Sequence, residues 1–121
     1  MNMIEATKIC FTKYARFSGR ARRAEYWWFG LFQISAVFGA MIIDVLNFST
    51  RWGDYGPISS IFMLITTIPT LAVAARRLHD IDRSGWWQLL SLVPIIGLIV
   101  LIIWLATAGD KGENRFGPDP L

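Results

Sequence analysis

Residues 26–46 read YWWFGLFQISAVFGAMIIDVL, residues 57–75 read PISSIFMLITTIPTLAVAA, and residues 86–105 read WWQLLSLVPIIGLIVLIIWL. A helix of about 20 residues, at about 1.5 Å per residue, covers the roughly 30 Å hydrocarbon core of a bilayer. Each of the three segments reaches that length with few or no charged residues. The sequence therefore predicts an all-α membrane protein with three transmembrane helices.

The composition favours a single membrane domain over residues 1–121. Hydrophobic residues make up 54% of the chain and charged residues 17%, whereas a typical soluble domain has about 25% charged residues. No cleavage site precedes the first apolar segment, so we expect a retained anchor helix rather than a cleavable signal peptide. Cys10 is the single cysteine, which rules out an internal disulfide and argues against a cysteine-based zinc site. We expect no cofactor and no bound metal.

Residues 3–17 predict a short basic amphipathic helix ahead of the first apolar segment. Apolar residues recur there at helical spacing, and a polar stripe runs from Glu5 to Arg16 on another side. Such a helix can lie in the membrane interface against anionic headgroups.

The basic residues predict the orientation of the helices. Nine of the twelve Lys and Arg residues lie before the first apolar segment or between the second and third. The positive-inside rule then places the N-terminus and the second loop in the cytoplasm, and three spans place the C-terminus outside. Trp27 and Trp86 mark the inner boundary in this scheme, and Trp104 marks the outer one, because tryptophan favours the headgroup level.

Pro94 and Gly97, near the middle of the third segment, leave two paths open. A kinked helix would cross the membrane once, whereas a re-entrant hairpin would return both of its ends to the cytoplasm. Because about 20 residues can cross once but not twice, we expect a full span. The tail after residue 109 would then lie on the opposite side from the second loop.

Polar residues within the first two segments predict that these helices pack against each other. Gln33 and Asp44 lie on one stripe of the first helix, and Thr66 and Thr70 lie on one stripe of the second. Hydrogen bonds between such stripes hold helices together in lipid. Asp44 has two possible roles: a hydrated carboxylate near Arg51 at the membrane boundary, or a proton or cation site.

Three polar motifs stand outside the apolar segments: FSGRARRAEYW at residues 17–27, RRLHDIDRSGWW at 76–87 and GENRFGPDP at 112–120. Together they closely resemble the DUF805 family of small bacterial inner-membrane proteins, and the resemblance extends from about Tyr14 to Pro120. It implies a multi-pass helical protein of the bacterial inner (plasma) membrane. It implies no reaction, substrate or catalytic residue.

The first two motifs supply the candidate residues for binding an anionic lipid headgroup, another anion or a partner protein. These residues are Arg20, Arg23, Arg76, Arg77, His79, Asp80 and Arg83. Paired arginines can bind phosphate through two parallel hydrogen bonds, although plain anchoring also explains them. His79 with Asp80 could instead ligate a metal or transfer protons, but a single histidine is weak support.

We also expect ion pairs that hold the cytoplasmic ends of the helices together. In this scheme Arg23 pairs with Asp80 or Asp82, and Glu25 pairs with Arg77 or Arg83.

The function we expect is non-enzymatic: docking of partner proteins or anionic lipids through the basic cytoplasmic face. No catalytic triad order, phosphate-binding glycine loop or metal-ligand spacing is present in the sequence. The alternative is a small transporter or channel component, which would act as a homo-oligomer because three helices cannot enclose a pathway. A third hypothesis is a lipid-modifying enzyme with His79 and Asp80 as acid and base. Nucleic-acid binding is not expected, since the positive-inside rule already explains the basic residues.

Overall fold

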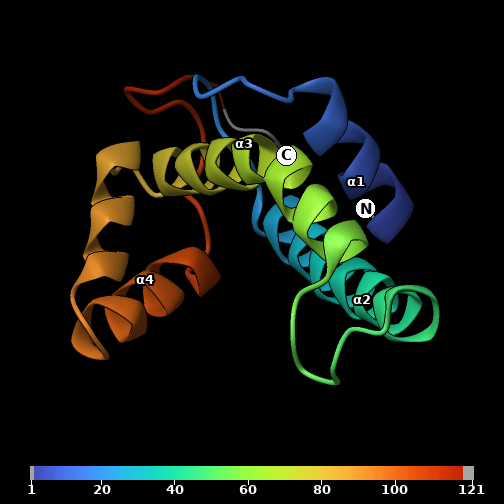
Figure 1. Ribbon diagram of the computed structural model, residues 1–121. Coiled ribbons are helices and arrows are strands. Elements are labelled where there is room, and N and C mark those ends of the chain that lie inside the picture. The colour runs from blue at the N-terminus through green and yellow to red at the C-terminus, as the bar shows by residue number, and fades with distance from the viewer. Residues whose placement is uncertain (1, 119–121) are drawn as a thin grey trace.

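The computed structural model describes residues 2–118, and all its regular elements are helices (Figure 1). They are α1 (Met3–Thr12), α2 (Arg23–Phe48), α3 (Pro57–Asp80), the 3-10 helix η1 (Gly85–Leu92) and α4 (Ile96–Ala106). The all-α prediction is confirmed. Two of the helices, α2 with 26 residues and α3 with 24, are long and apolar enough to cross a membrane, whereas α4 has only 11 residues.

Helices α2 and α3 form an antiparallel pair joined by polar contacts between the predicted stripes. The side-chain amide of Gln33 donates to the Thr66 hydroxyl at 2.6 Å. Thr70 instead donates to the backbone carbonyl of Thr66 at 2.7 Å, within its own helix. The predicted packing of the two stripes is therefore confirmed at Gln33 and Thr66.

Asp44 has a structural task that neither of our two interpretations described. Its carboxylate is fully buried and accepts hydrogen bonds from the backbone N–H groups of Ile58 and Ser59, at 2.8 and 3.0 Å. The Ser59 hydroxyl donates to it at 2.7 Å. These N–H groups belong to the first turn of α3 and have no partner within the helix. Asp44 thus caps the N-terminus of α3, and its negative charge is stabilised by the positive end of the helix dipole.

Helix α1 packs across the α2–α3 pair (Figure 1), and its buried residues are apolar. Ala6 and Cys10 are fully buried, and Cys10 contacts a cluster that includes Phe29 and Val73. The predicted N-terminal helix is confirmed over Met3–Thr12, which is shorter than the expected 3–17. Its position in the membrane interface stays a prediction.

The third apolar segment forms a hairpin of two short helices. The chain turns at Val93–Ile95, between η1 and α4, where Ile95 has a positive φ of 63°. The rings of Trp87 and Trp104 then meet edge to face with centroids 5.5 Å apart. Gly97 is required at this turn, because a Cβ there would overlap the carbonyl oxygen of Leu90. The expectation of one continuous helix is wrong, and the hairpin alternative describes the structure.

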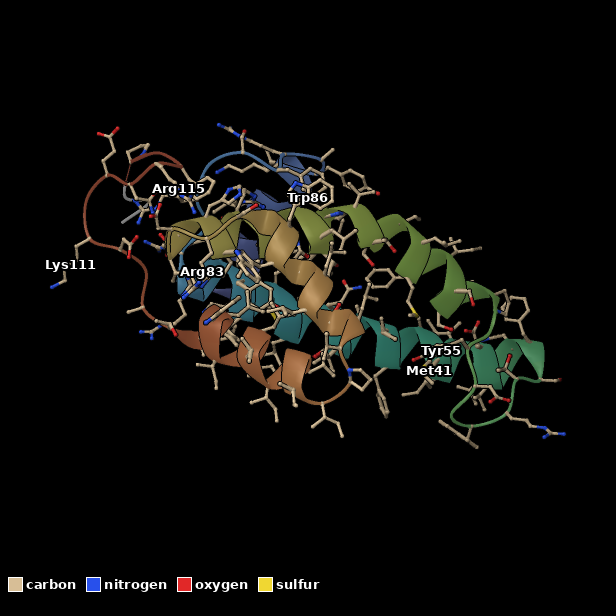
Figure 2. All side chains as sticks on the ribbon, turned by 90° about the vertical axis from the view of Figure 1, so that its left-hand side faces the viewer. Met41, Tyr55, Arg83, Trp86, Lys111 and Arg115 are labelled. Carbon is tan, nitrogen blue, oxygen red and sulfur yellow. The ribbon has the colours of Figure 1, made fainter. Side chains whose placement is uncertain are left out.

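The hairpin brings the tail back to the end of the molecule where α2 begins. The backbone N–H of Asp110 donates to the carbonyl of Asp80 at 2.8 Å, and the Trp27 indole donates to the carbonyl of Leu105 at 3.1 Å. Figure 2 shows Lys111 and Arg115 at one end of the molecule, with Tyr55 at the other. Trp104 and the tail therefore do not lie at the opposite end of the molecule from the second loop, as the three-span scheme requires. Their position relative to a membrane stays a prediction.

Replacing Gly97 distinguishes the hairpin from a continuous span. In the hairpin, Gly97→Ala forces a methyl group into the Leu90 backbone and is expected to lower the free energy of unfolding by about 1–3 kcal/mol. In an uninterrupted helix the same change would be stabilising by up to about 1 kcal/mol. Gly39→Ala is the matched control, since a Cβ there meets nothing within 4 Å. Denaturant unfolding in detergent, followed by circular dichroism, measures both.

Candidate functional site

Charged side chains form a buried network at the end of the molecule where α2 begins and α3 ends. None is more than 6% exposed, and they are Arg20, Glu25, Arg76, Arg77 and Asp80. Buried charges are costly unless they are paired and fully hydrogen-bonded. The network therefore depends on the precise positions of its carboxylates and of the backbone carbonyls around it.

Asp80, in the last turn of α3, lies between two arginines. One carboxylate oxygen accepts from Arg20, with a closest N···O distance of 2.9 Å, and the other accepts from Arg77, also at 2.9 Å. Two guanidinium groups thus share one carboxylate, which leaves an excess of positive charge. Backbone carbonyls supply the remaining acceptors.

Arg20 connects the network to the tail through hydrogen bonds. Its Nη1 donates to the carbonyl oxygens of Gly112 and Gly117, at 2.5 and 3.2 Å, and its Nη2 donates to that of Asp110 at 2.5 Å. A guanidinium has five N–H donors in a fixed plane, so one side chain can donate hydrogen bonds to several backbone segments at once. Arg20 alone thus contacts three backbone carbonyls of the tail and helps to hold the tail against the helices.

Arg77 connects the network to the C-terminal end of α4. Its Nε donates to the carbonyl of Leu105 at 3.0 Å, and its Nη2 donates to the carbonyl of Thr107. The carbonyls at the end of a helix lack partners within it and carry its negative partial charge. Arg77 therefore fixes the returning limb of the hairpin to α3.

Arg76 pairs with Glu25 in the first turn of α2, at 2.6 Å. Its Nε and Nη2 have no hydrogen-bond partner among residues 2–118. The nearby Cys10 thiol is an unreactive group, because burial, reinforced by the charge of Glu25, raises its pKa to about 12. A thiol that stays protonated at neutral pH is a poor nucleophile.

The predicted joining of the helix ends by ion pairs is confirmed, but the predicted partners are wrong. Arg23 donates to the carbonyl of Ala106 at 3.1 Å rather than to an aspartate, and Asp82 pairs at the surface with Arg115 at 3.2 Å. Arg83 lies over the ring of Trp104, 4.0 Å from its centroid. The partners differ because α2 begins only at Arg23, so that Arg20 lies in the preceding turn and reaches Asp80.

His79 joins the third motif to this end of the molecule. Its ring stacks on Phe116 with centroids 4.0 Å apart and planes 2° from parallel. Its Nδ1 lies 2.8 Å from the carbonyl oxygen of Gly19, and Asn114 donates to its backbone carbonyl at 2.9 Å. The last two residues of the motif, 119 and 120, lie outside the described residues. Within residues 2–118 no three His, Cys, Asp or Glu side chains are grouped to hold a metal ion.

Two adjoining pockets open beside the network. The first, which we call the basic pocket, has a volume of about 420 Å³. Three basic residues, Arg22, Arg23 and Lys111, line it together with two acidic ones, Asp80 and Asp110. The second, the tryptophan groove, has about 460 Å³ and is lined by Arg23, Ala24, Trp27, Trp28 and Leu31. Arg23 and Ala24 line both, so the charged basic pocket continues directly into an apolar groove.

The basic pocket also lies at the N-terminus of α2. Arg22 is the residue that precedes the helix, and its side chain makes no capping hydrogen bond. The Nε of Arg22 has no partner among the described residues. Uncapped N–H groups and unpaired guanidinium donors both favour an anion. Of the three basic residues that line this pocket, Arg23 was predicted from the sequence to bind an anion, and Arg22 and Lys111 were not.

The carboxylate of Asp80 is the group whose loss should cost most. Asp80→Asn leaves Arg20 and Arg77 buried without their shared anion, and we expect it to lower the free energy of unfolding by about 3–5 kcal/mol. Asp82→Asn, two residues away, breaks an exposed pair and is expected to cost at most about 1 kcal/mol. Equal losses in the two variants, measured by unfolding in detergent, would contradict the network as described.

Comparison with known proteins gives a consistent family match. The DUF805 family, described as a protein of unknown function, matches residues 14–118. "Inner membrane protein YhaH" of Escherichia coli (strain K12) is 47% identical over 107 residues, covering 88% of this chain and 88% of the relative. "Inner membrane protein YhaI" of the same strain is 50% identical over 107 residues, covering 88% and 87%. No solved structure matches this chain.

Proposed function

The chain belongs to the DUF805 family, and we propose that it is a multi-pass protein of the bacterial inner membrane that binds an anionic phospholipid without catalysing a reaction. Relatives of about half identity carry the name inner membrane protein. Helices α2 and α3 have the length and composition of membrane spans. The lipid would bind from the leaflet that faces the basic end of the molecule.

That leaflet is the cytoplasmic one in our proposal. Eleven of the twelve Lys and Arg residues lie no later than the first residue of α2, or in the last two turns of α3 and beyond. Arg51 alone lies in the loop between α2 and α3. Because the hairpin returns the tail to the basic end, the positive-inside rule favours both termini in the cytoplasm. This replaces our expectation of an external C-terminus.

The observation that carries the proposal is the continuity of the basic pocket with the tryptophan groove. A phosphate in the basic pocket could accept hydrogen bonds from Arg22, Arg23 and Lys111, which line it. An acyl chain leaving that phosphate would meet the half-exposed rings of Trp27 and Trp28. Tryptophan favours this depth in a bilayer, where its ring is apolar and its N–H is hydrated. The basic pocket and the tryptophan groove thus follow each other in the same order as the phosphate and the acyl chain of a phospholipid.

Several of the residues that we predicted to bind anions have internal roles instead. Arg20 and Arg77 are buried, and their donors are taken by Asp80 and by backbone carbonyls. The headgroup proposal therefore rests on Arg23, with Arg22 and Lys111 added. Asp44 serves as a helix cap and Asp80 is shared between two arginines, so we propose neither a transport role for Asp44 nor acid–base catalysis by Asp80.

The test compares two double variants of equal charge. Arg22→Ala/Lys111→Ala removes two cations from the basic pocket, and Lys8→Ala/Arg51→Ala removes two exposed cations elsewhere. We expect the pocket variant to bind phosphatidylglycerol at least tenfold more weakly, since hydrogen bonds between charged groups are worth about 1.5–3 kcal/mol each. The control should bind it as the unaltered protein does. Binding is measured by native mass spectrometry after mild extraction.

An equal loss in both variants would show that the lipid responds only to net charge, and it would contradict a built site. Retention of phosphatidylglycerol by the pocket variant would contradict the proposal as well.

A further inference from the structure

A third pocket lies against the end of α3 and has a different chemical character. Its volume is about 450 Å³, and it shares no lining residue with the basic pocket or the tryptophan groove. Its walls come from the loop before α2, from α3 and from η1, and they are Phe17, Leu71, Ala75, His79, Ser84, Gly85, Trp86, Gln88 and Leu89. None of these residues carries a full charge when His79 is neutral. The pocket therefore suits an uncharged ligand.

The hydrogen bond to Gly19 determines which nitrogen of His79 can act in this pocket. A backbone carbonyl is only an acceptor, so the 2.8 Å contact from Nδ1 to the Gly19 oxygen requires the proton on Nδ1. In the neutral ring Nε2 then carries a lone pair and no hydrogen. Nε2 is thus an acceptor, and it needs a donor.

The ring is held in place while Nε2 is left uncovered. Phe116 stacks on its face. Gly85, which also lines the pocket, packs closely against α3, because a Cβ there would lie 2.8 Å from the Cβ of Ala75. The same Cβ would lie 3.6 Å from Nε2, so glycine keeps a side chain away from this nitrogen. No hydrogen bond to Nε2 occurs within residues 2–118. A fixed acceptor therefore faces a pocket that is otherwise apolar except for Ser84 and Gln88.

The outer walls of the pocket are apolar and exposed. Trp86 is 79% exposed, Leu89 58% and Phe17 44%. Figure 2 shows Trp86 on η1, well separated from Lys111 in the tail. In a protein whose α2 and α3 cross the membrane, such walls face lipid at the level of the headgroups, where amphiphiles are concentrated.

We propose that this pocket binds an uncharged membrane amphiphile through a hydroxyl group that donates to Nε2 of His79, with its apolar tail against Trp86 and Leu89. Two kinds of membrane molecule have this chemistry: quinols, with a phenolic hydroxyl, and diacylglycerols, with an aliphatic one. The proposal depends on the membrane location of the chain but not on the basic pocket, and each can fail without the other.

The test uses short-tailed probes with and without the hydroxyl hydrogen. The purified protein in detergent is titrated with a decyl benzoquinol and its dimethyl ether, and with dioctanoylglycerol and its methyl ether. Bound probe is counted by native mass spectrometry. We expect at least one probe to bind with one-to-one stoichiometry, about five- to tenfold more tightly than its ether, which is the ratio that one net hydrogen bond provides. The probe that binds more tightly shows whether the natural ligand is a quinol or a diacylglycerol.

Two variants assign the effect to the pocket. His79→Phe keeps a ring to stack on Phe116 but removes Nε2, and it should bring the ratio of probe to ether binding to about one. Leu89→Trp, at an exposed position, fills part of the pocket and leaves His79 in the sequence. It should weaken the binding of probe and ether by the same factor. Arg22→Ala/Lys111→Ala is the matched control and should leave the ratio unchanged.

Three results would overturn the proposal. They are equal binding of probe and ether to the unaltered protein, an unchanged ratio in His79→Phe, and undiminished probe binding in Leu89→Trp. If phosphatidylglycerol binding is lost only in the Arg22→Ala/Lys111→Ala variant, the headgroup proposal still holds.

Discussion

The carboxylate of Asp80, shared by Arg20 and Arg77, is the interaction on which the arrangement of the chain depends. Arg20 extends from it to the carbonyls of the tail, and Arg77 extends from it to the end of α4. Segments up to 97 residues apart in the sequence are thereby joined around one anion. Because burial of unpaired charge is expensive, the tail, the hairpin and the loop before α2 are fixed together.

This network also explains why the third apolar segment is a hairpin. Arg77 needs the carbonyls of Leu105 and Thr107 as acceptors. A helix that crossed the membrane would carry these carbonyls to the far side and leave Arg77 buried with too few partners. The turn at Pro94 and the absence of a side chain at Gly97 make the return path possible.

Much of the fold could be predicted from hydropathy and spacing. The two long helices and the contact between Gln33 and Thr66 follow from apolar length and from polar stripes at helical spacing. The hairpin did not follow, because apolar length alone cannot distinguish one crossing from two short limbs. Trp104 could not indicate the path of the third segment, because a tryptophan marks a membrane boundary without distinguishing one boundary from the other. Lys111 lies beside Arg22 only because the hairpin turns back on itself, so this position could not be predicted without the hairpin.

The three motifs that carry the family resemblance have a common physical explanation. FSGRARRAEYW supplies Arg20 and Glu25, RRLHDIDRSGWW supplies the two arginines and Asp80, and GENRFGPDP supplies backbone carbonyls together with Phe116. They meet at one end of the molecule, and a charged pocket and an uncharged pocket lie next to them. The distinction between these pockets is the basis for separating a phospholipid site from a site for a hydroxyl-bearing amphiphile.

The central claim is that all three motifs lie on one side of the membrane, and labelling of single cysteines tests it most directly. Ser18→Cys, Tyr55→Cys and Glu113→Cys would each be made in a Cys10→Ser background and treated with a membrane-impermeant maleimide in sealed vesicles of known orientation. The account predicts that positions 18 and 113 are labelled from the same side and position 55 from the other. Labelling of position 113 together with position 55 would contradict the hairpin and the network that depends on it.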